Sequence, residues 1–345
     1  MVVVMGHEAG PAEIDAVVTL VEAAGGSAFV SRGVSRTIVG LVGDIQQFES
    51  LNLANLPGVS EVLRISKPYK LVSREHHPQT STILVGGVPI GSSTFTLIAG
   101  PCAVEDADQT LAAALMAQRA GAVLLRGGAY KPRTSPYAFQ GLGEAGLKIL
   151  ADVRTETGMP VVTEVVDARD VELVASYADM LQIGTRNMQN FALLQAVGST
   201  DKPVMLKRGL TATLEEWLMA AEYIAQRGNL QIVLCERGIR SFDPSTRNTL
   251  DISAVPMIRS MSHLPIIVDP SHSAGRKDLV VPLARAAMAI GADAVMVDVH
   301  PHPETALCDG PQALVESDLL ELAEAVRTIP ALLGRRPATR QASTV

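Results

Sequence analysis

The sequence has few aromatic residues, few cysteines and no excess of positive charge. Aromatic residues make up 3% of the chain while hydrophobic residues make up 47%, so the core must be built mainly from Val, Leu, Ile and Ala. That composition is typical of α/β proteins rich in parallel sheet. The formal net charge of −7 argues against a nucleic-acid-binding protein, because such proteins usually present a basic surface.

Cysteine usage and the start of the chain argue against two further classes. The three cysteines, Cys102, Cys235 and Cys308, lie far apart, so they predict neither a disulfide framework nor a CxxC metal motif. The chain begins MVVVMGHE, where no basic segment precedes the apolar residues and Glu8 interrupts them. We therefore expect no signal peptide, no membrane span and a location in the reducing cytoplasm.

Short apolar runs alternate with helix-length segments from about residue 85 onward. The runs predicted as strands are Thr96–Ala99, Val123–Leu125, Val161–Thr163, Met180–Ile183, Val204–Leu206, Ile232–Leu234, Ile266–Val268 and Ala294–Val297. Eight strand–helix units over about 240 residues predict a (β/α)8 TIM barrel. An open doubly wound sheet is the alternative, but no GxGxxG motif follows a first strand.

The first 70 residues predict a separate small α+β domain. Its elements follow the βαββαβ order of a ferredoxin-like module, at Val2–Met5, Ala12–Ala24, Ala28–Val30, Thr37–Val42, Ile45–Leu53 and Ser60–Ile65. We expect residues 71–82 to be a linker and residues 83–333 to form the barrel, with a hairpin at Ile83–Ile90 that closes its bottom. Residues 334–345 lack apolar periodicity and are predicted to be a disordered tail.

The segment 122–143, AVLLRGGAYKPRTSPYAFQGLG, indicates an anion-binding loop at the end of a buried strand. Its glycines let the backbone approach a ligand, and its cations and hydroxyls suit phosphate or carboxylate. The residues concerned are Arg126, Lys131, Arg133, Thr134 and Ser135. A solvated surface turn is the alternative, but a proline on each side of the Arg-Thr-Ser triplet favours a stiff loop.

Chemistry in a TIM barrel gathers where the strands end. The predicted strand ends carry Cys102, Arg126, Glu164, Arg186, Lys207-Arg208, Arg237, Asp269-His272 and Asp298-His300. At least five of these ends bear Arg or Lys in a chain that has more acids than bases, which predicts a site for small molecules with several negative charges. Ordinary salt bridges account for one or two of these cations, but not for all of them.

The same strand ends also indicate a metal site. Cys102, His272, Asp298 and Asp309 offer sulfur, nitrogen and oxygen donors, which suit Mn, Fe, Co or Zn better than Mg or Ca. Each of them also has a plainer role, as a small buried residue, a loop histidine or an ion-pair partner. The HxH pair of His300 and His302 is a weaker alternative, because Pro301 marks the end of the strand.

At this point the chain closely resembles the 3-deoxy-D-arabino-heptulosonate 7-phosphate (DAHP) synthases, type I beta class, with an N-terminal ferredoxin-like regulatory domain. The motifs that carry the resemblance occur in order over nearly the whole chain: IAGPCAVE (98–105), LRGGAYKPRTSPYAFQGLG (125–143), QIGTRNMQN (182–190), LKRG (206–209), CERGIR (235–240), STRNTLDISAVP (245–256), VDPSHSAG (268–275), VHPHPE (299–304) and CDGPQAL (308–314).

The resemblance implies a transferase that condenses phosphoenolpyruvate (PEP) with erythrose 4-phosphate at the start of the shikimate pathway to aromatic amino acids. Arg126 and Lys207 would hold the PEP carboxylate, and Arg186 and Arg237 its phosphate. The loop residues Arg133, Thr134 and Ser135 would bind the sugar phosphate. The implied catalytic residues are Lys131, Cys102 and His272, and the implied metal ligands are Cys102, His272, Asp298 and Asp309.

General chemistry agrees with these roles. C3 of PEP is a weak nucleophile, so a Lewis-acidic metal is needed to polarise the aldehyde. Lys131 would protonate the forming alkoxide, and we expect nearby cations to lower its pKa. Two features of the predicted metal site stand apart. Asp298 stands where the resemblance predicts Glu, and Cys308 precedes the predicted ligand Asp309, which suggests an oxidisable pair with Cys102.

Two other functions and one regulatory property follow as hypotheses. The sister reaction with arabinose 5-phosphate, of 3-deoxy-D-manno-octulosonate (KDO) 8-phosphate synthases, is a rival, although that family lacks the N-terminal domain. A PEP-binding barrel that has lost catalysis is the other. The resemblance implies feedback inhibition by Tyr or Phe at residues 1–70, or else a domain that only helps assembly, and it implies a homotetramer.

Overall fold

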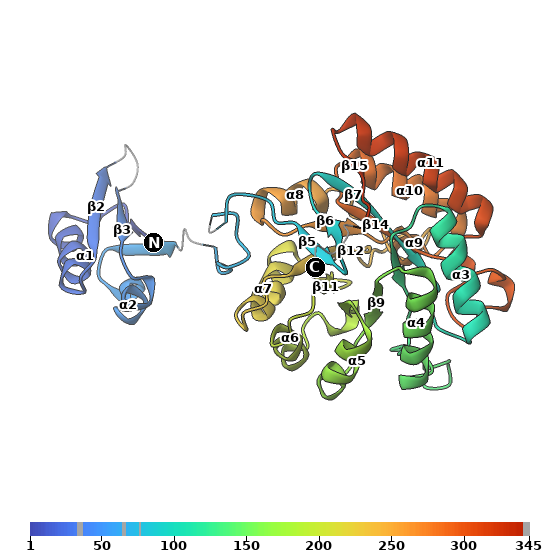
Figure 1. Ribbon diagram of the computed structural model, residues 1–345. Coiled ribbons are helices and arrows are strands. Elements are labelled where there is room, and N and C mark those ends of the chain that lie inside the picture. The colour runs from blue at the N-terminus through green and yellow to red at the C-terminus, as the bar shows by residue number, and fades with distance from the viewer. Residues whose placement is uncertain (33–36, 64–66, 76, 341–345) are drawn as a thin grey trace. The chain divides into compact units, whose positions relative to one another are not determined.

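The computed structural model describes residues 1–32, 37–63, 67–75 and 77–340. The chain divides into two compact units, Met1–Pro68 and Tyr69–Val345 (Figure 1). In the described residues, no helix combines the length and the apolar composition that crossing a membrane requires.

The first unit has the predicted ferredoxin-like fold. Its elements are β1 (Val2–Met5), α1 (Pro11–Ala23), β2 (Ser27–Arg32), β3 (Thr37–Val42), α2 (Ile45–Ser50), a 3-10 turn at Leu53–Asn55 and β4 (Val59–Leu63). The four strands form an antiparallel sheet in the order β2-β3-β1-β4. Helix α1 presents Ile14, Val17 and Val21 at helical spacing, and these residues pack on the sheet through Val3 and Val39.

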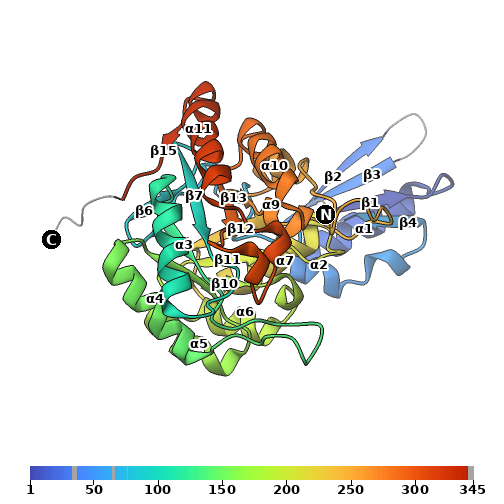
Figure 2. The same ribbon diagram turned by 90° about the vertical axis from the view of Figure 1, so that its right-hand side faces the viewer.

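The second unit is a closed barrel of eight parallel strands (Figures 1 and 2). The strands are β7 (Thr94–Gly100), β8 (Leu124–Arg126), β9 (Val161–Glu164), β10 (Met180–Ile183), β11 (Val204–Lys207), β12 (Ile232–Glu236), β13 (Ile266–Val268) and β14 (Ala294–Asp298). Pairing of β14 with β7 closes the barrel. The fold is therefore the predicted TIM barrel, and the open sheet is wrong.

A helix follows each strand and covers the outside of the barrel (Figure 2). These helices are α3 (Ala107–Arg119), α4 (Glu144–Thr157), α5 (Val171–Tyr177), α6 (Phe191–Gly198), α7 (Leu214–Ala225), α8 (Ala254–Met261), α10 (Lys277–Ala289) and α11 (Glu316–Leu332). One extra short helix, α9 (Pro270–Ala274), sits directly after β13. Its first turn is capped by Asp269, whose carboxylate accepts the backbone N–H of His272 at 3.0 Å.

Side chains that alternate along each strand divide the core into two layers. On β11, for example, Val204 and Leu206 face the helices, while Met205 belongs to a second cluster inside the barrel. The hairpin of β5 (Ile83–Val85) and β6 (Val88–Ile90) packs into that inner cluster, which places it at one end of the barrel as the sequence predicts. Two glycines with positive φ, Gly86 and Gly87, make its tight turn.

The segment predicted as a linker is instead attached to the barrel. The Glu222 carboxylate on α7 accepts the backbone N–H groups of Leu71 and Val72 at 2.9 and 3.1 Å. Arg74 donates to the carbonyl oxygens of Arg259 and Ser262 at the end of α8. Val72 is also buried in the same core cluster as Val204 and Leu206. One buried apolar residue and hydrogen bonds to backbone atoms leave no signature in apolar periodicity.

The predicted disordered tail is also partly ordered. Residues Arg336–Pro337 form a short strand, β15, which pairs with Thr94 and Phe95 of β7. Ala338 is buried in the inner cluster of the barrel beside the β5–β6 hairpin. One small residue is enough for this contact, so the apolar pattern does not reveal it. Residues 341–345 lie outside the described part of the chain.

Candidate active site

Charged residues occupy the last inward position of several barrel strands. Leu124 and Met205 face the barrel interior, and two residues later Arg126 and Lys207 take the same side of their strands. The sequence pattern ends both predicted strands one residue early, because it counts the charged residue as the start of a loop. The buried cations are instead strand residues, which fixes their direction toward the barrel axis.

These strand ends and the loops after them enclose a cavity of about 470 Å³. Eight cationic side chains line it, against the two carboxylates Glu164 and Asp309. The cations are Arg126, Lys131, Arg133, Arg186, Lys207, Arg237, Arg240 and Arg247. Such an excess of positive charge in a chain with net charge −7 suits a ligand with several anionic groups, as the sequence predicts. Sequence reasoning placed neither Arg240 nor Arg247 in the site.

Two buried guanidinium groups keep an unused donor. Arg237 is 7% exposed, and its Nη1 atom has no hydrogen-bond partner among the described residues. The Nε atom of Arg126 is likewise buried and has no hydrogen-bond partner among the described residues. Burial lowers the pKa of Arg237, while Asp269 and other anionic neighbours partly offset this. A buried cationic N–H without a partner is unfavourable, so these atoms mark where a bound anion would be stabilised.

The two residues predicted for the PEP carboxylate each have a carboxylate partner in the protein. Arg126 Nη1 lies 2.7 Å from Asp298 Oδ1, and Lys207 Nζ lies 2.6 Å from Asp269 Oδ2. Both pairs are almost completely buried. Burial disfavours the charged form of Arg126, but Asp298, Cys102 and Asp269 together outweigh burial and raise the pKa of Arg126. The cavity is therefore assembled with part of its positive charge already balanced.

The loop after β8 folds back over the predicted metal site. Lys131 Nζ donates to the carbonyl oxygen of Cys102 at 2.9 Å and lies 3.1 Å from its Sγ atom. Arg133 Nη1 approaches Cys308 Sγ at 2.6 Å. A Cβ atom at Gly128 would come within 2.6 Å of the Cys102 carbonyl oxygen, so this position requires glycine.

The Lys131 prediction needs one correction. Burial alone would lower the pKa of its ammonium group, but the anionic influence of Cys102 and Cys308 outweighs both burial and the opposing effect of Arg126. The pKa of Lys131 is therefore raised, not lowered as neighbouring cations suggest. The lysine keeps its proton at neutral pH.

The other two loop residues lie on the cavity wall. Thr134 Oγ1 accepts a hydrogen bond from Arg186 Nη2 at 3.2 Å, which joins the predicted sugar-phosphate and PEP-phosphate residues directly. Ser135 lines the same cavity. The structure therefore brings together all eight residues predicted to bind substrate.

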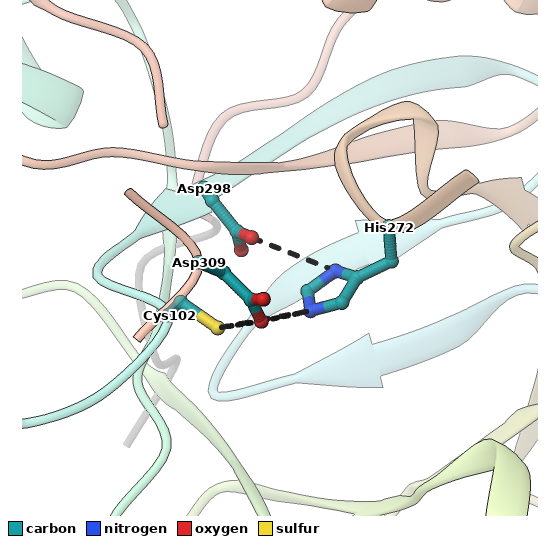
Figure 3. A group of neighbouring side chains, drawn as sticks. All are labelled: Cys102, His272, Asp298 and Asp309. Carbon is teal, nitrogen blue, oxygen red and sulfur yellow. Dashed lines mark hydrogen bonds and ion pairs between the residues drawn. The ribbon is translucent and has the colours of Figure 1, made fainter. Parts of the chain in front are cut away.

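The four predicted metal ligands converge in space (Figure 3). One donor atom from each of Cys102, His272, Asp298 and Asp309 lies within 4.8 Å of the other three. Cys102 Sγ is 3.2 Å from Asp309 Oδ2, and His272 Nε2 is 3.7 Å from both atoms. Their elements lie up to 207 positions apart in the chain, so the cluster is a product of the fold.

Neighbouring groups orient these donors in the way metal sites require. Asp269 Oδ2 lies 2.9 Å from His272 Nδ1, an ion-pair contact without hydrogen-bond geometry, and thereby turns Nε2 toward Cys102 and Asp309. Burial opposes protonation of His272, but Asp269 and Asp298 raise its pKa to about 9. His272 and Arg247 hold the pKa of Asp309 well below its usual range despite burial. The donor types and their separations fit a divalent transition metal ion.

Asp298 is the predicted ligand that stands where Glu is expected, and both of its oxygens have protein partners. Besides Arg126 at Oδ1, Gln312 Nε2 donates to Oδ2 at 2.6 Å. Gln312 also lies 3.3 Å from Arg247, which pairs with Asp309 at 3.0 Å. Sequence reasoning missed Gln312 because nothing at its position marks a contact with a carboxylate 14 residues earlier.

The alternative HxH metal pair does not form. His300 Nδ1 accepts the backbone N–H of His302 at 3.0 Å, and its Nε2 faces Glu105 Oε2 at 3.4 Å. The His302 side chain is 73% exposed. In contrast, the two cysteines suggested as an oxidisable pair do lie close together, with Cys102 Sγ 3.8 Å from Cys308 Sγ.

Comparisons with known proteins identify relatives over nearly the whole chain. The family model for the DAHP synthetase I family matches residues 72–333, and the model for the DAHP synthase ferredoxin-like domain matches residues 1–67. The phospho-2-dehydro-3-deoxyheptonate aldolase of Thermotoga maritima is 52% identical over 334 residues, which cover 97% of this chain and 99% of that protein. A 2-dehydro-3-deoxyphosphooctonate aldolase of Geobacter sp. is 34% identical over 74% of this chain and all of its own length.

Solved structures show the same relationship. The crystal structure of the Thermotoga maritima aldolase, also named DAHP synthase, matches with a TM-score of 0.86 and 50% identity over 97% of this chain and 98% of that one. A truncated form of the 3-deoxy-D-arabino-heptulosonate 7-phosphate synthase from the same organism matches with a TM-score of 0.73 and 52% identity over 77% of this chain and 98% of that one. The chain therefore belongs to the DAHP synthetase I family and is an enzyme of the transferase class.

Proposed function

We propose that the protein condenses PEP with D-erythrose 4-phosphate to give DAHP and phosphate, in a reaction that depends on a divalent metal ion and opens the shikimate pathway. One observation carries the proposal. The cavity lined by eight cations adjoins the four-donor cluster, so a substrate with several anionic groups would lie beside a Lewis acid. Membership of the family supports the same reaction.

PEP would bind deepest in the cavity. Arg126 ends β8 and Lys207 ends β11, and the two would hold its carboxylate, while Arg186 and Arg237 would hold its phosphate. The unpartnered Nη1 of Arg237 is ready to donate to a phosphate oxygen. Fixing both ends of PEP directs its C3 atom toward the second substrate, which lowers the entropic part of the barrier.

Erythrose 4-phosphate would bind nearer the mouth. Arg133, Thr134 and Ser135 would take its phosphate, which places its aldehyde toward the Cys102 loop. A metal ion held by Cys102, His272, Asp298 and Asp309 would polarise the aldehyde oxygen.

Lys131 would supply the proton that the new alkoxide needs. Its Nζ atom lies at the Cys102 end of the cavity and stays protonated because its pKa is raised. As C3 attacks the aldehyde, positive charge develops at C2 and water adds there. Phosphate then leaves from the resulting hemiketal phosphate, and the buried arginines stabilise its negative charge.

The N-terminal unit would regulate this activity by binding Tyr or Phe. Two observations support a ligand-binding role: the match to the family's ferredoxin-like domain, and a cavity of about 290 Å³ in this unit. The cavity is lined by Met1, Phe48, Glu49, Asn52, Leu53, Ala54 and Val62. We further propose that the enzyme acts in the cytoplasm as a homotetramer, which light scattering would measure.

The test is PEP consumption by purified, reduced protein. We expect turnover with erythrose 4-phosphate and Mn²⁺, none with chelator, and none with arabinose 5-phosphate. Turnover with arabinose 5-phosphate instead would assign the chain to the octulosonate reaction, which the Geobacter relative's name makes the relevant rival. No turnover with either sugar and several metals would leave a PEP-binding barrel without catalysis.

A further inference from the structure

Glu105 lies outside the cavity but joins two loops that carry metal-site residues. It follows Cys102 by three positions in the loop after β7, and its side chain is 10% exposed. Its Oε1 atom accepts the backbone N–H of Leu307 at 2.8 Å. Leu307 belongs to the loop after β14 and precedes Asp309 by two positions. The hydrogen bond therefore spans two loops that are about 200 residues apart in sequence.

The second oxygen of Glu105 meets a buried histidine. His300 is 5% exposed, and its Nδ1 atom accepts the N–H of His302. The ring proton of neutral His300 is therefore on Nε2, which faces Glu105 Oε2 at 3.4 Å. Both carboxylate oxygens thus contact the segment that runs from β14 to Asp309, so the carboxylate cannot turn without losing one of them.

The loop that Glu105 holds ends in an unusual backbone conformation. Asp309 has φ +55° and ψ +30°, the left-handed region that residues other than glycine seldom adopt. The next residue, Gly310, passes so close to the Pro303 carbonyl oxygen that a Cβ atom would overlap it. The Leu307 side chain is 53% exposed and adds little packing. A conformation of this kind persists only when surrounding contacts hold it.

We propose that Glu105 is a positioning residue that ties the Asp309 loop to the Cys102 loop and so sets the distance between two of the metal donors. That distance is 3.2 Å between Cys102 Sγ and Asp309 Oδ2. The inference rests on the proposed metal dependence. Residues that orient metal ligands from behind typically change metal affinity by about 10- to 100-fold when they are removed.

The experiment is a Co²⁺ titration of the metal-free, full-length protein, followed by the near-ultraviolet absorption of the Cys102 thiolate bound to Co²⁺. Wild type is compared with Glu105→Ala, Glu105→Gln and the control Glu304→Ala. Glu304 carries the same charge and lies in the Asp309 loop that Glu105 contacts, but its side chain is 70% exposed. Calorimetry of each metal-free variant measures its melting temperature separately.

We expect Glu304→Ala to bind Co²⁺ like wild type and Glu105→Ala to bind it roughly 10- to 100-fold more weakly. Glu105→Gln should lie between them, because its amide oxygen still accepts the Leu307 N–H while its NH₂ group cannot accept from His300. Equal affinity for Co²⁺ in wild type and Glu105→Ala would overturn the inference. This holds even if the melting temperature of Glu105→Ala falls, because Glu105 would then stabilise the fold without setting the metal site.

Two further outcomes are decisive. A wild type that binds no Co²⁺ would overturn the metal proposal, and the role of Glu105 with it. If Glu105→Ala does not fold, the titration is made on Glu105→Asp, whose carboxylate is one methylene short of the Leu307 N–H. Affinity for Co²⁺ must fall in that variant too, and an unchanged value would contradict the inference.

Discussion

Arg237 is a buried cation at which stability and the proposed binding of PEP can be tested separately. Its Nη1 atom has no partner among the described residues, and burial lowers its pKa. We expect Arg237→Met to raise the free energy of unfolding of the unliganded protein by about 1–3 kcal/mol, because an apolar side chain removes a buried charge that Asp269 and its other neighbours compensate only in part. The same change should raise KM for PEP by roughly 100-fold, since a buried charge pair contributes about 2–5 kcal/mol.

Denaturant unfolding and steady-state kinetics measure the two effects separately. Arg276→Met is the control, because Arg276 is exposed and pairs only with its neighbour Asp278 among the described contacts. A loss of stability in Arg237→Met would contradict the prediction, since it would mean that the arginine is well satisfied without substrate.

Asp298 gives a second prediction at this scale. Its carboxylate is held by Arg126 and Gln312 and is one methylene shorter than the expected Glu. We expect Asp298→Glu to tighten Mn²⁺ binding by about tenfold and to change the order in which metals activate the enzyme, because the longer side chain reaches further toward the other donors. Equilibrium dialysis measures the affinity. Unchanged affinity with an unchanged order of metals would disprove this account.

The two active-site thiols predict sensitivity to oxidation. Cys102 and Cys308 lie 3.8 Å apart, and their contact lowers the pKa of Cys308. With hydrogen peroxide as oxidant, both thiols would be oxidised to one disulfide while peroxide is reduced to two waters. We expect wild type to lose activity and two titratable thiols, and to regain both with a thiol reductant. Cys308→Ala treated with peroxide should form no such disulfide, so a thiol reductant should not restore its activity. If wild type and Cys308→Ala respond identically to peroxide and reductant, the disulfide between Cys102 and Cys308 is ruled out.

Sequence reasoning reached residues whose position on a strand decides their direction. Arg126 and Lys207 directly follow apolar runs, which is enough to place them at strand ends. The structure adds that both continue their strands and take the inward side. Asp269 was visible at a strand end, but its role in orienting His272 needs the distance of 2.9 Å. Gln312, Arg247 and Glu105 act across loops, and no local pattern encodes which loops meet.

At the scale of elements, helix α7 holds the segment that enters the barrel. Glu222 is 6% exposed and accepts two backbone N–H groups, those of Leu71 and Val72. We expect Glu222→Ala to lower the free energy of unfolding by about 2–4 kcal/mol, because it leaves two donors in an apolar setting without acceptors. The exposed Glu215 on the same helix gives the control Glu215→Ala, for which the expected change is about 0.5 kcal/mol or less.

Hydrogen exchange locates this effect. The amides of Leu71 and Val72 should exchange faster in Glu222→Ala than in wild type. The amides of strands β9 and β10 should lose no more protection than the fall in the global free energy of unfolding accounts for. Unchanged exchange at Leu71 and Val72 would mean that another contact holds the segment.

Regular elements were predictable because burial repeats along them. The eight barrel strands and the ferredoxin-like elements follow apolar periodicity closely, and the β5–β6 hairpin was recognisable from its two glycines. The linker and the tail were not. Each is fixed at few points, among them Glu222 and Arg74 for the linker, and β15 and Ala338 for the tail, which are too few to form a pattern.

At the scale of the whole molecule, two separate units predict separable functions. A chain that starts at Tyr69 keeps the complete barrel and all four candidate metal ligands. We expect it to keep PEP condensation within about threefold of the full chain and to lose inhibition by Tyr or Phe. Initial rates with and without each amino acid test this. Inhibition that persists in the shortened chain would place the regulatory site in the barrel.

Closure of the barrel between β7 and β14 has a consequence for how the protein is made. The edge of β7 emerges from the ribosome long before β14, because about 200 residues separate their pairing partners. Translation proceeds at roughly 5–20 residues per second, so the edge of β7 stays without its β14 partner for about 10 to 40 seconds. The ferredoxin-like sheet needs no later segment and can fold first. Nascent barrels therefore expose an unpaired parallel edge during synthesis. We expect chaperones to be needed most during that interval.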